Sequence, residues 1–275
     1  MRILLTGRNG QVGWELERVL GALGEVTATD RQGMDLANPD TLPRKIRDAR
    51  PELIVNAAAY TAVDKAEAEP ELAMQVNGKA PGVMAEEAKR LGALLVHYST
   101  DYVFDGTQQG AYGEDDKTGP LSVYGKSKLA GEEAIRRSGC RHLILRTSWV
   151  YGPRGRNFYL TIAAKAAAGE SLRVVDDQRG VPTTSRFLAE ETAALLRKNA
   201  TGTLHLVPSG EATWYGFARE IVQGKVRVDP IRSGEFKSAA RRPANSVLDN
   251  RRAAALLGRA LRDWQSLLDS VRQSA

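Results

Sequence analysis

A tyrosine and a lysine four residues apart are the side chains of this sequence best suited to proton transfer. Tyr124 and Lys128 lie within residues 121–135, where Pro120 ends a loop and the residues that follow favour a helix. Side chains four apart share one face of a helix. A lysine ammonium near a phenol stabilises the phenolate and lowers the pKa of the tyrosine toward neutrality. The pair is therefore predicted to give or take a proton at working pH, provided that the chain builds a site around it.

A glycine-rich turn follows the first predicted strand. Residues 2–6 are a short apolar, β-favouring run, and Gly7, Gly10 and Gly13 come next, before a predicted helix over residues 14–20. In such a turn the first glycine permits the sharp bend, the second lets the backbone approach a pyrophosphate, and the third lets helix and strand pack closely. The spacing here is G-x-x-G-x-x-G, which departs from the usual G-x-G-x-x-G. The prediction of a pyrophosphate site therefore depends on the position of the turn directly after the first strand.

An acidic residue ends the second predicted strand, residues 25–30. Asp30 at this place favours a hydrogen bond to the adenosine ribose of NAD, whereas the neighbouring Arg31 could accommodate a 2′-phosphate. Asp35 and Leu36 follow on a loop that could pass the adenine. The choice between NADH and NADPH stays open at this point.

Strands and helices alternate as far as residue 148, with further predicted strands at residues 52–56, 93–98 and 141–146. This alternation predicts an α/β fold with a Rossmann-type, doubly wound parallel sheet. Residues 1–148 are expected to form the dinucleotide-binding domain. Residues 149–275 are expected to form mainly a smaller, mostly helical lobe, with segments near 170–186 returning to the first domain.

Composition narrows the class of protein. The chain has 275 residues, of which 42% are apolar and 26% charged, as in ordinary globular proteins. No apolar run approaches the roughly 18 residues of a membrane span, and the first residues lack the pattern of a signal peptide. A single cysteine, Cys140, cannot form an internal disulfide, which fits a reducing cytoplasm. We therefore expect a cytoplasmic protein without a membrane partner.

The charge pattern points to small phosphorylated ligands. The net charge is +6, and the basic residues are scattered or paired, so no nucleic-acid-binding arm is expected. The three histidines, His97, His142 and His205, show no metal-ligand spacing, which argues against a metal hydrolase.

Several motifs together resemble a known family. Residues 7–13 with Thr100, Tyr124 and Lys128 look like the extended short-chain dehydrogenase/reductase superfamily. Five longer segments resemble the dTDP-4-dehydrorhamnose reductases, and the similarity runs from residue 1 to about residue 250. These segments are residues 55–67, 97–104, 123–132, 146–151 and 242–246. The resemblance implies NAD(P)H-dependent reduction of the C4 keto group of dTDP-4-dehydro-L-rhamnose to give dTDP-L-rhamnose.

The resemblance also implies residue roles on the cofactor side. The residues implied to contact the cofactor are Gly7, Gly10, Gln11 and Val12 at the pyrophosphate, Asp30, Asp35 and Leu36 at the adenosine, Ala59, Tyr60 and Thr61 along the channel, and Tyr124 and Lys128 at the nicotinamide end. Tyr124 would protonate the carbonyl oxygen, and Lys128 would hold the nicotinamide ribose and bias the phenol.

On the substrate side, the resemblance implies that Thr100 and Asp101 contact the sugar of the dTDP-sugar, with Thr100 on the reacting carbonyl. Trp149 would pack against the sugar ring. Arg242 is a candidate for the nucleotide diphosphate, because a guanidinium fork matches phosphate oxygens, and an exposed arginine without that role is the alternative.

One departure from the family concerns an interface metal. Some members dimerise through a metal held by a glutamate equivalent to Glu15 and by acids on a later helix. Here the second position is Arg186, with Glu190 one turn on, and an arginine near Glu15 favours an ion pair over a cation site. We therefore expect no Mg²⁺, and a monomer or weak homodimer.

Two other functions remain open from the sequence. Regulatory subunits of methionine adenosyltransferase share this pattern without being known for sugar reduction, although the intact set of Thr100, Tyr124 and Lys128 argues for an enzyme. Another sugar-nucleotide enzyme of the superfamily, an epimerase, dehydratase or reductase, is the second alternative.

Overall fold

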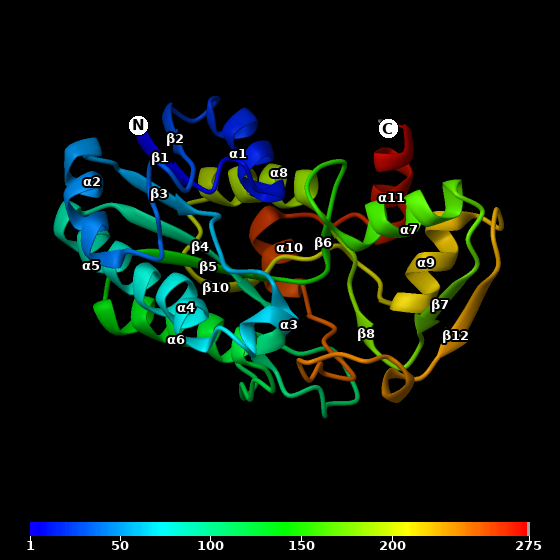
Figure 1. Cartoon of the computed structure of the whole chain (residues 1–275). Coiled ribbons are helices and arrows are strands. Elements are labelled where there is room, and N and C mark those ends of the chain that lie inside the picture. Colours follow the sequence, from blue (N-terminus) through cyan, green and yellow to red (C-terminus); the bar gives the residue numbers. More distant parts are fainter. Residues whose placement is uncertain (274–275) are drawn as a thin grey trace.

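Six parallel strands form the central sheet of the computed structural model, which describes residues 1–273 (Figure 1). The strands are β1 (Arg2–Thr6), β2 (Glu25–Thr29), β3 (Leu53–Asn56), β4 (Leu94–Thr100), β5 (His142–Thr147) and β10 (Gly202–His205). They lie in the order β10-β5-β4-β3-β1-β2, and every neighbouring pair is parallel. The chain adds β2 on one side of β1 and then β3 on the other. The topological switch point, where such sheets bind ligands, therefore lies between β1 and β3.

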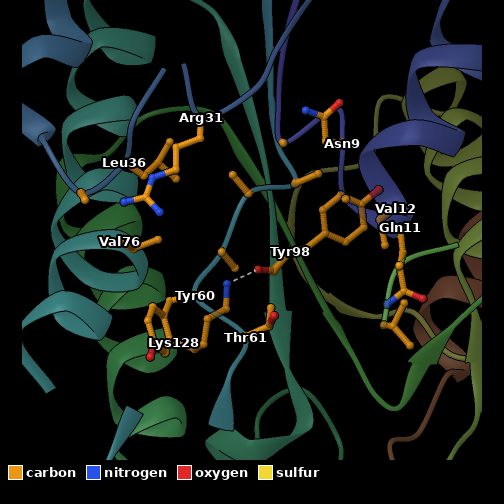
Figure 2. A pocket seen from close by; sticks show the side chains of 18 of the residues that line it. Asn9, Gln11, Val12, Arg31, Leu36, Tyr60, Thr61, Val76, Tyr98 and Lys128 are labelled. Atoms are coloured by element: carbon orange, nitrogen blue, oxygen red, sulfur yellow. Dashed lines mark hydrogen bonds between the residues drawn. The ribbon is translucent and has the colours of Figure 1, made fainter. Parts of the chain in front are cut away.

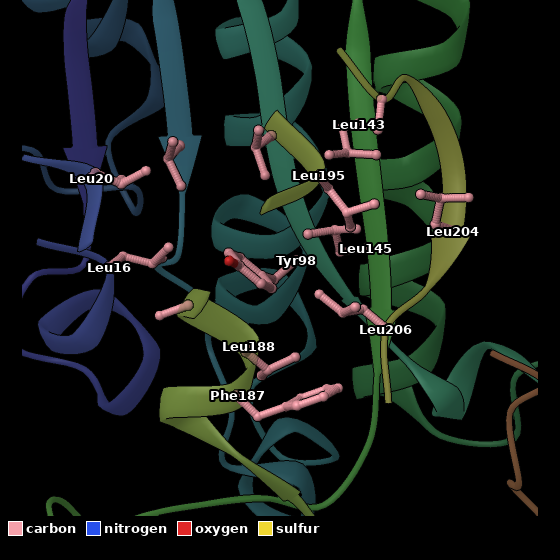
Figure 3. Close-up of a cluster of buried hydrophobic side chains, with 14 of the residues drawn as sticks. Leu16, Leu20, Tyr98, Leu143, Leu145, Phe187, Leu188, Leu195, Leu204 and Leu206 are labelled. Carbon is pink, nitrogen blue, oxygen red and sulfur yellow. The ribbon is translucent and has the colours of Figure 1, made fainter. Parts of the chain in front are cut away.

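Alternate side chains of each strand enter separate cores on the two faces of the sheet. Leu5 of β1 packs with Leu16 of α1 (Gln11–Leu20) and with Phe187 of α8 (Ser185–Arg197), in the cluster drawn in Figure 3. Leu4, one residue earlier, joins the core on the other face. The helices of that face are α2 (Leu42–Ala49), α5 (Ala80–Leu91) and α6 (Val123–Ser138), while α10 (Arg251–Leu257) adds to the first face. The predicted doubly wound α/β fold is confirmed.

Residues 70–91 form three helical pieces in succession. These are α4 (Pro70–Met74), a π-helical turn at Gln75–Lys79, and α5. The π turn contains the buried Asn77, and π turns of this kind often mark functional sites. Short helical turns also occur at Pro39–Thr41, at α3 (Val63–Ala66) and at Asp101–Val103.

A second, smaller lobe lies beside the sheet (Figure 1). It holds α7 (Phe158–Ala167), α9 (Trp214–Val222), α11 (Trp264–Gln273) and a short turn at Ser233–Glu235. Its strand pairs are β7 (Leu172–Val175) with β12 (Val228–Ile231), β8 (Arg179–Gly180) with β11 (Ala212–Thr213), and β6 (Val150–Tyr151) with β9 (Thr183–Thr184). Tyr151, Phe217 and Trp264 belong to its own buried core. The lobe is thus a mixture of helices and short strands.

The chain crosses between sheet and lobe in a way that differs from the predicted boundary. Residues near 170–186 were expected to return to the sheet, but β7 pairs with β12 inside the lobe. The segments that do return are α8, β10 and α10, of which β10 extends the sheet beside β5. Local apolar patterns predict an element but do not specify which body of the fold it packs against.

Among the described residues 1–273, no helix is both long and apolar enough to cross a bilayer.

A buried ion pair joins α6 to the sheet. Arg146 of β5 donates to both carboxylate oxygens of Glu132, at 2.9 and 2.8 Å, and the two side chains are 3% and 0% exposed. Burial raises the pKa of Glu132, but the hydrogen bonds and charge of Arg146 outweigh it, so the pKa is lowered overall. The ionised pair therefore sets how α6, with Tyr124 and Lys128, lies on the sheet.

Replacing Glu132 with glutamine should destabilise the protein by about 3 kcal/mol or more, because the Arg146 cation stays buried without its anion. Chemical denaturation measures this. Glu133→Gln is the matched control, since Glu133 forms an exposed pair with Arg137 at 3.4 Å and should cost about 0.5 kcal/mol or less. Since the folded-state pKa of Glu132 lies below 4.5, the stabilisation is present above that pH and is lost as the pH falls through the folded value. Equal effects of the two substitutions would contradict this account.

Candidate active site

A cavity of about 710 Å³ opens at the carboxyl edge of the sheet, at the switch point (Figure 2). Its wall comes from the segments after β1, β2 and β3, from α6, and from a lobe loop that contributes Gly155 and Arg156. The structure brings together in this wall all of the residues predicted on the cofactor side, namely Gly7, Gly10, Gln11, Val12, Asp30, Asp35, Leu36, Ala59, Tyr60, Thr61, Tyr124 and Lys128.

The glycine turn has the shape that a pyrophosphate needs. Gly7 has φ 77°, and a Cβ there would come within 2.8 Å of the backbone nitrogen of Ala58. A Cβ on Gly13 would overlap the carbonyl of Gly7, so the turn and the first turn of α1 touch directly. Gly10 precedes α1 and has no side chain that could cap the helix, whose N-terminus is a favourable place for an anion. These backbone groups fit the diphosphate of a dinucleotide.

The part of the cavity that is predicted to hold the adenosine has one fixed carboxylate, Asp30, and one exposed cation, Arg31. The Asp30 carboxylate accepts from the backbone N–H groups of Gly33 at 3.1 Å and Gln32 at 3.0 Å, and these bonds lower the pKa of Asp30. Arg31 is 79% exposed and lies 3.4 Å from a carboxylate oxygen of Asp35. Asp30 is therefore held as an anion, while the Arg31 guanidinium can reorient toward a ligand.

A buried asparagine braces the loop after β3 against α6. Asn77 accepts from the backbone N–H of Tyr60 at 2.9 Å, and its amide donates to the Tyr60 carbonyl at 2.9 Å and to Ser127 at 3.0 Å. The Tyr60 phenol donates to Glu69 at 2.6 Å. Sequence reasoning assigned Asn77 no role. The available signal was an asparagine among the alanines and other helix-favouring residues of positions 70–91.

The electrostatics of Tyr124 differ from the sequence-based prediction. Burial raises the pKa of Tyr124 to about 12, although a hydrogen-bonding contact with Thr100 acts in the opposite direction. The Lys128 amine donates instead to the backbone carbonyl of Tyr98 on β4, at 2.5 Å (Figure 2). The prediction that Lys128 lowers the pKa of Tyr124 toward neutrality is therefore wrong for the free protein, because burial dominates and β4 engages the lysine.

The four residues predicted for the sugar nucleotide lie outside the described cavity wall. Thr100 and Asp101 are both buried, and the Thr100 hydroxyl donates to the Asp101 carboxylate at 2.9 Å. Burial raises the pKa of Asp101 to about 7. Through its contact with Tyr124, Thr100 lies next to the group predicted to transfer the proton.

Trp149 and Arg242 have protein partners in the structure. The Trp149 ring stacks on Trp214 with centroids 3.6 Å apart and planes 8° from parallel. The Arg242 guanidinium is 19% exposed and binds the Asp64 carboxylate at 2.7 Å, which lowers the pKa of Asp64. Arg242 is therefore an anchored side chain. Its predicted contact with a diphosphate, like that of Trp149 with a sugar, stays a prediction.

Glu15 lies beside arginines, as its sequence context suggested. Burial raises the pKa of Glu15, while the charges of Arg18 and Arg186 act to lower it. Arg186 itself pairs with Glu190 at 2.8 Å. Within residues 1–273, no group of three or more histidine, cysteine, aspartate or glutamate side chains is arranged to hold a metal ion.

Fold and site together define a Rossmann-type protein of the short-chain dehydrogenase/reductase class, with its glycine turn at the switch point and a tyrosine–lysine helix beside the same cavity. A family model described as the RmlD substrate binding domain matches residues 1–275.

Curated relatives of similar sequence identify the family within this class. A dTDP-4-dehydrorhamnose reductase of Burkholderia thailandensis is 45% identical over 285 residues, covering 96% of each chain, and that of Escherichia coli K12 is 42% identical, covering 96% of this chain and 95% of its own. The chain therefore belongs to the dTDP-4-dehydrorhamnose reductase family. The resemblance found in the sequence is confirmed.

Solved structures agree with this family. A dTDP-4-dehydrorhamnose reductase of Clostridium acetobutylicum has a TM-score of 0.95 at 37% identity, covering 100% of this chain and 99% of its own. That of Bacillus anthracis, in complex with NADP, has a TM-score of 0.95 at 33% identity with the same coverage.

Replacing Arg31 with alanine should raise the Kd for NADPH about tenfold and leave the Kd for NADH nearly unchanged, because the exposed guanidinium is expected to pair with the 2′-phosphate, which NADH lacks. Fluorescence titration of the two cofactors measures this. Arg44→Ala removes an equal charge from an 89% exposed side chain outside the cavity and is the control. A similar change for both cofactors would mean that Arg31 does not discriminate between them.

Proposed function

We propose that this protein is an oxidoreductase that uses NAD(P)H to reduce the C4 keto group of dTDP-4-dehydro-L-rhamnose, giving dTDP-L-rhamnose. One observation carries the proposal. Four separate segments that are predicted to bind the cofactor, including the Tyr124–Lys128 helix, line the same cavity. The names of relatives 45% and 42% identical over nearly the whole chain support the substrate.

The proposed cofactor site follows the cavity wall. The glycine turn with Gly10, Gln11 and Val12 holds the pyrophosphate, Asp30, Asp35 and Leu36 hold the adenosine, and Ala59, Tyr60 and Thr61 line the channel. Lys128 binds the nicotinamide ribose. When bound, NAD(P)H supplies the hydride that reduces the carbonyl carbon.

Tyr124 is the proposed proton donor. With its pKa raised to about 12, the phenol is fully protonated at neutral pH, which is the form that a donor needs. As reduction places negative charge on the C4 oxygen, Tyr124 gives its proton to that oxygen. Lys128, one helical turn away, then supplies positive charge near the phenolate, and the Thr100 hydroxyl orients the carbonyl.

The sugar nucleotide is proposed to bind between the two bodies of the chain, with the sheet domain holding the cofactor and the lobe holding the substrate. Asp101 and Trp149 contact the sugar. Arg242 Nη1 donates to Asp64, Ser238 and the Ala240 carbonyl, and Nη2 donates to Asp64. The remaining N–H groups of its five-donor guanidinium are the ones proposed to bind phosphate oxygens.

We also propose a cytoplasmic protein that acts as a monomer or weak homodimer, without a resident Mg²⁺, nucleic acid or membrane partner. The single buried Cys140 supports a reducing compartment. The Arg186–Glu190 pair beside Glu15 supports an ion-paired surface at that place.

The direct test is oxidation of NADPH and of NADH, followed by loss of nicotinamide absorbance, with dTDP-4-dehydro-L-rhamnose as acceptor. Stoichiometric oxidation of either cofactor with formation of dTDP-L-rhamnose is expected. A protein that retains NAD and converts sugar nucleotides without net reduction would be an epimerase instead. A protein that gives no oxidation but binds a methionine adenosyltransferase tightly would be a regulatory subunit.

Tyr124→Phe should lower kcat roughly a hundredfold or more, because the general acid is lost, and should leave the Kd for NADPH nearly unchanged. Steady-state assays and cofactor titration measure the two quantities. Tyr159→Phe, which removes a hydroxyl in the lobe core, is the control and should keep wild-type kcat. Near-wild-type turnover of Tyr124→Phe would remove Tyr124 from this role.

A further inference from the structure

A chain of buried polar side chains crosses the sheet behind the cavity, from β1 to α6. Thr6, Asn56, His97 and Lys128 are each at most 2% exposed. The Thr6 hydroxyl donates to Asn56 Oδ1 at 2.7 Å, and Asn56 Nδ2 lies 3.0 Å from His97 Nδ1. His97 Nε2 lies 3.3 Å from Lys128 Nζ. The chain therefore ends at a residue of the proposed active site.

The proton of His97 is fixed by this chain. The backbone N–H of Ala58 donates to Asn56 Oδ1 at 3.3 Å, which orients the amide so that its NH₂ group faces His97. An amide NH₂ only donates, so His97 Nδ1 must accept, and the neutral ring carries its proton on Nε2. Burial holds the pKa of His97 well below its usual range, which keeps the ring neutral.

The Nε2–H group of His97 consequently points at Lys128 Nζ. An ammonium has no lone pair and cannot accept this hydrogen, whereas a neutral amine can. The other bond of Lys128, to the Tyr98 carbonyl at 2.5 Å, is compatible with both forms (Figure 2). The 3.3 Å contact is thus a hydrogen bond only when Lys128 is an amine.

The remaining charged groups around Lys128 leave this preference in place. Glu132 on the same helix favours the ammonium, but Arg146 of β5 binds its carboxylate with two hydrogen bonds. Across the cavity, Lys65 and Glu69 pair with each other at 2.8 Å. Tyr124 is a neutral phenol at neutral pH. Burial lowers the pKa of Lys128 to about 8, so the amine is accessible near physiological pH.

We propose that His97 is a positioning residue that favours the amine form of Lys128 in the free protein, so that cofactor binding near pH 8 is coupled to uptake of a proton by Lys128. This rests on the proposed role of Lys128 at the nicotinamide ribose. Ribose oxygens accept N–H bonds from an ammonium, and the negative charge of the dinucleotide favours a cation. The amine takes the proton from solvent and forms a new N–H bond, and the hydrogen bond from His97 Nε2–H to Nζ is lost. Near pH 8, cofactor binding thus completes the positive charge that the Tyr124 phenolate needs.

Calorimetric titration of the full chain with NADPH, in buffers of different ionisation enthalpy, measures the protons taken up. About 0.5 proton per NADPH is expected near pH 8, falling toward zero near pH 6.5 where Lys128 is already protonated. Lys128→Met should abolish the uptake. His97→Asn keeps an acceptor for Asn56 but places nothing opposite Nζ, and should lower the uptake near pH 8 about fivefold. Unchanged uptake in His97→Asn would overturn the proposal.

His142→Gln is the matched control, because His142 lies on β5 and its ring nitrogen meets the Cys140 carbonyl at 2.9 Å, away from the cavity. It should keep wild-type proton uptake. Nitrogen-15 NMR of histidine in the unmodified chain tests the tautomer without any substitution. A neutral ring protonated on Nε2 is expected for His97, and a ring protonated on Nδ1 would contradict the proposal.

The outcomes separate this inference from the proposed function. A protein that reduces the dTDP-sugar without proton uptake on binding NADPH would refute the role of His97 and keep the reductase. A protein that takes up the proton but reduces no dTDP-sugar would do the reverse.

Discussion

Helix α6 lies so close to the surrounding chain that two of its positions have no room for a side chain. A Cβ on Gly125 would overlap the carbonyl of Tyr102, and one on Gly131 would overlap the carbonyl of Asn77. Together with these backbone contacts, the Glu132–Arg146 ion pair fixes the orientation of α6 and its distance from the sheet. Tyr124 and Lys128 both belong to this helix. The packing of its backbone therefore determines the positions of the Tyr124 hydroxyl and the Lys128 amine.

Burial favours the uncharged form of three ionisable side chains at the site, Tyr124, Asp101 and Lys128. It raises the pKa of Tyr124 to about 12 and that of Asp101 to about 7, and it lowers the pKa of Lys128 to about 8. Each shift favours the uncharged form, as expected where water is excluded. Tyr124 is therefore uncharged at neutral pH, whereas Asp101 and Lys128 change charge close to physiological pH.

The meeting of the predicted cofactor residues in one cavity wall could be predicted from the sequence because most of them follow a strand of the sheet. The glycine turn after β1, Asp30 after β2 and Ala59–Thr61 after β3 reach one sheet edge whatever the rest of the chain does. The pKa of Tyr124 could not be predicted, since it depends on burial and on the carbonyl of Tyr98, which takes Lys128. The partner of Arg242 could not be predicted either, because Asp64 lies 178 residues earlier.

The repeated crossing of the chain between sheet and lobe has a mechanical consequence. The lobe is joined to the sheet domain through β6, through the β9–α8 junction and again after β10, so the two bodies do not hang on a single hinge. A wide opening of the space between them would have to strain several backbone links at once. Any change in the distance across that space therefore has to be shared among these links, and no single loop can act as the hinge.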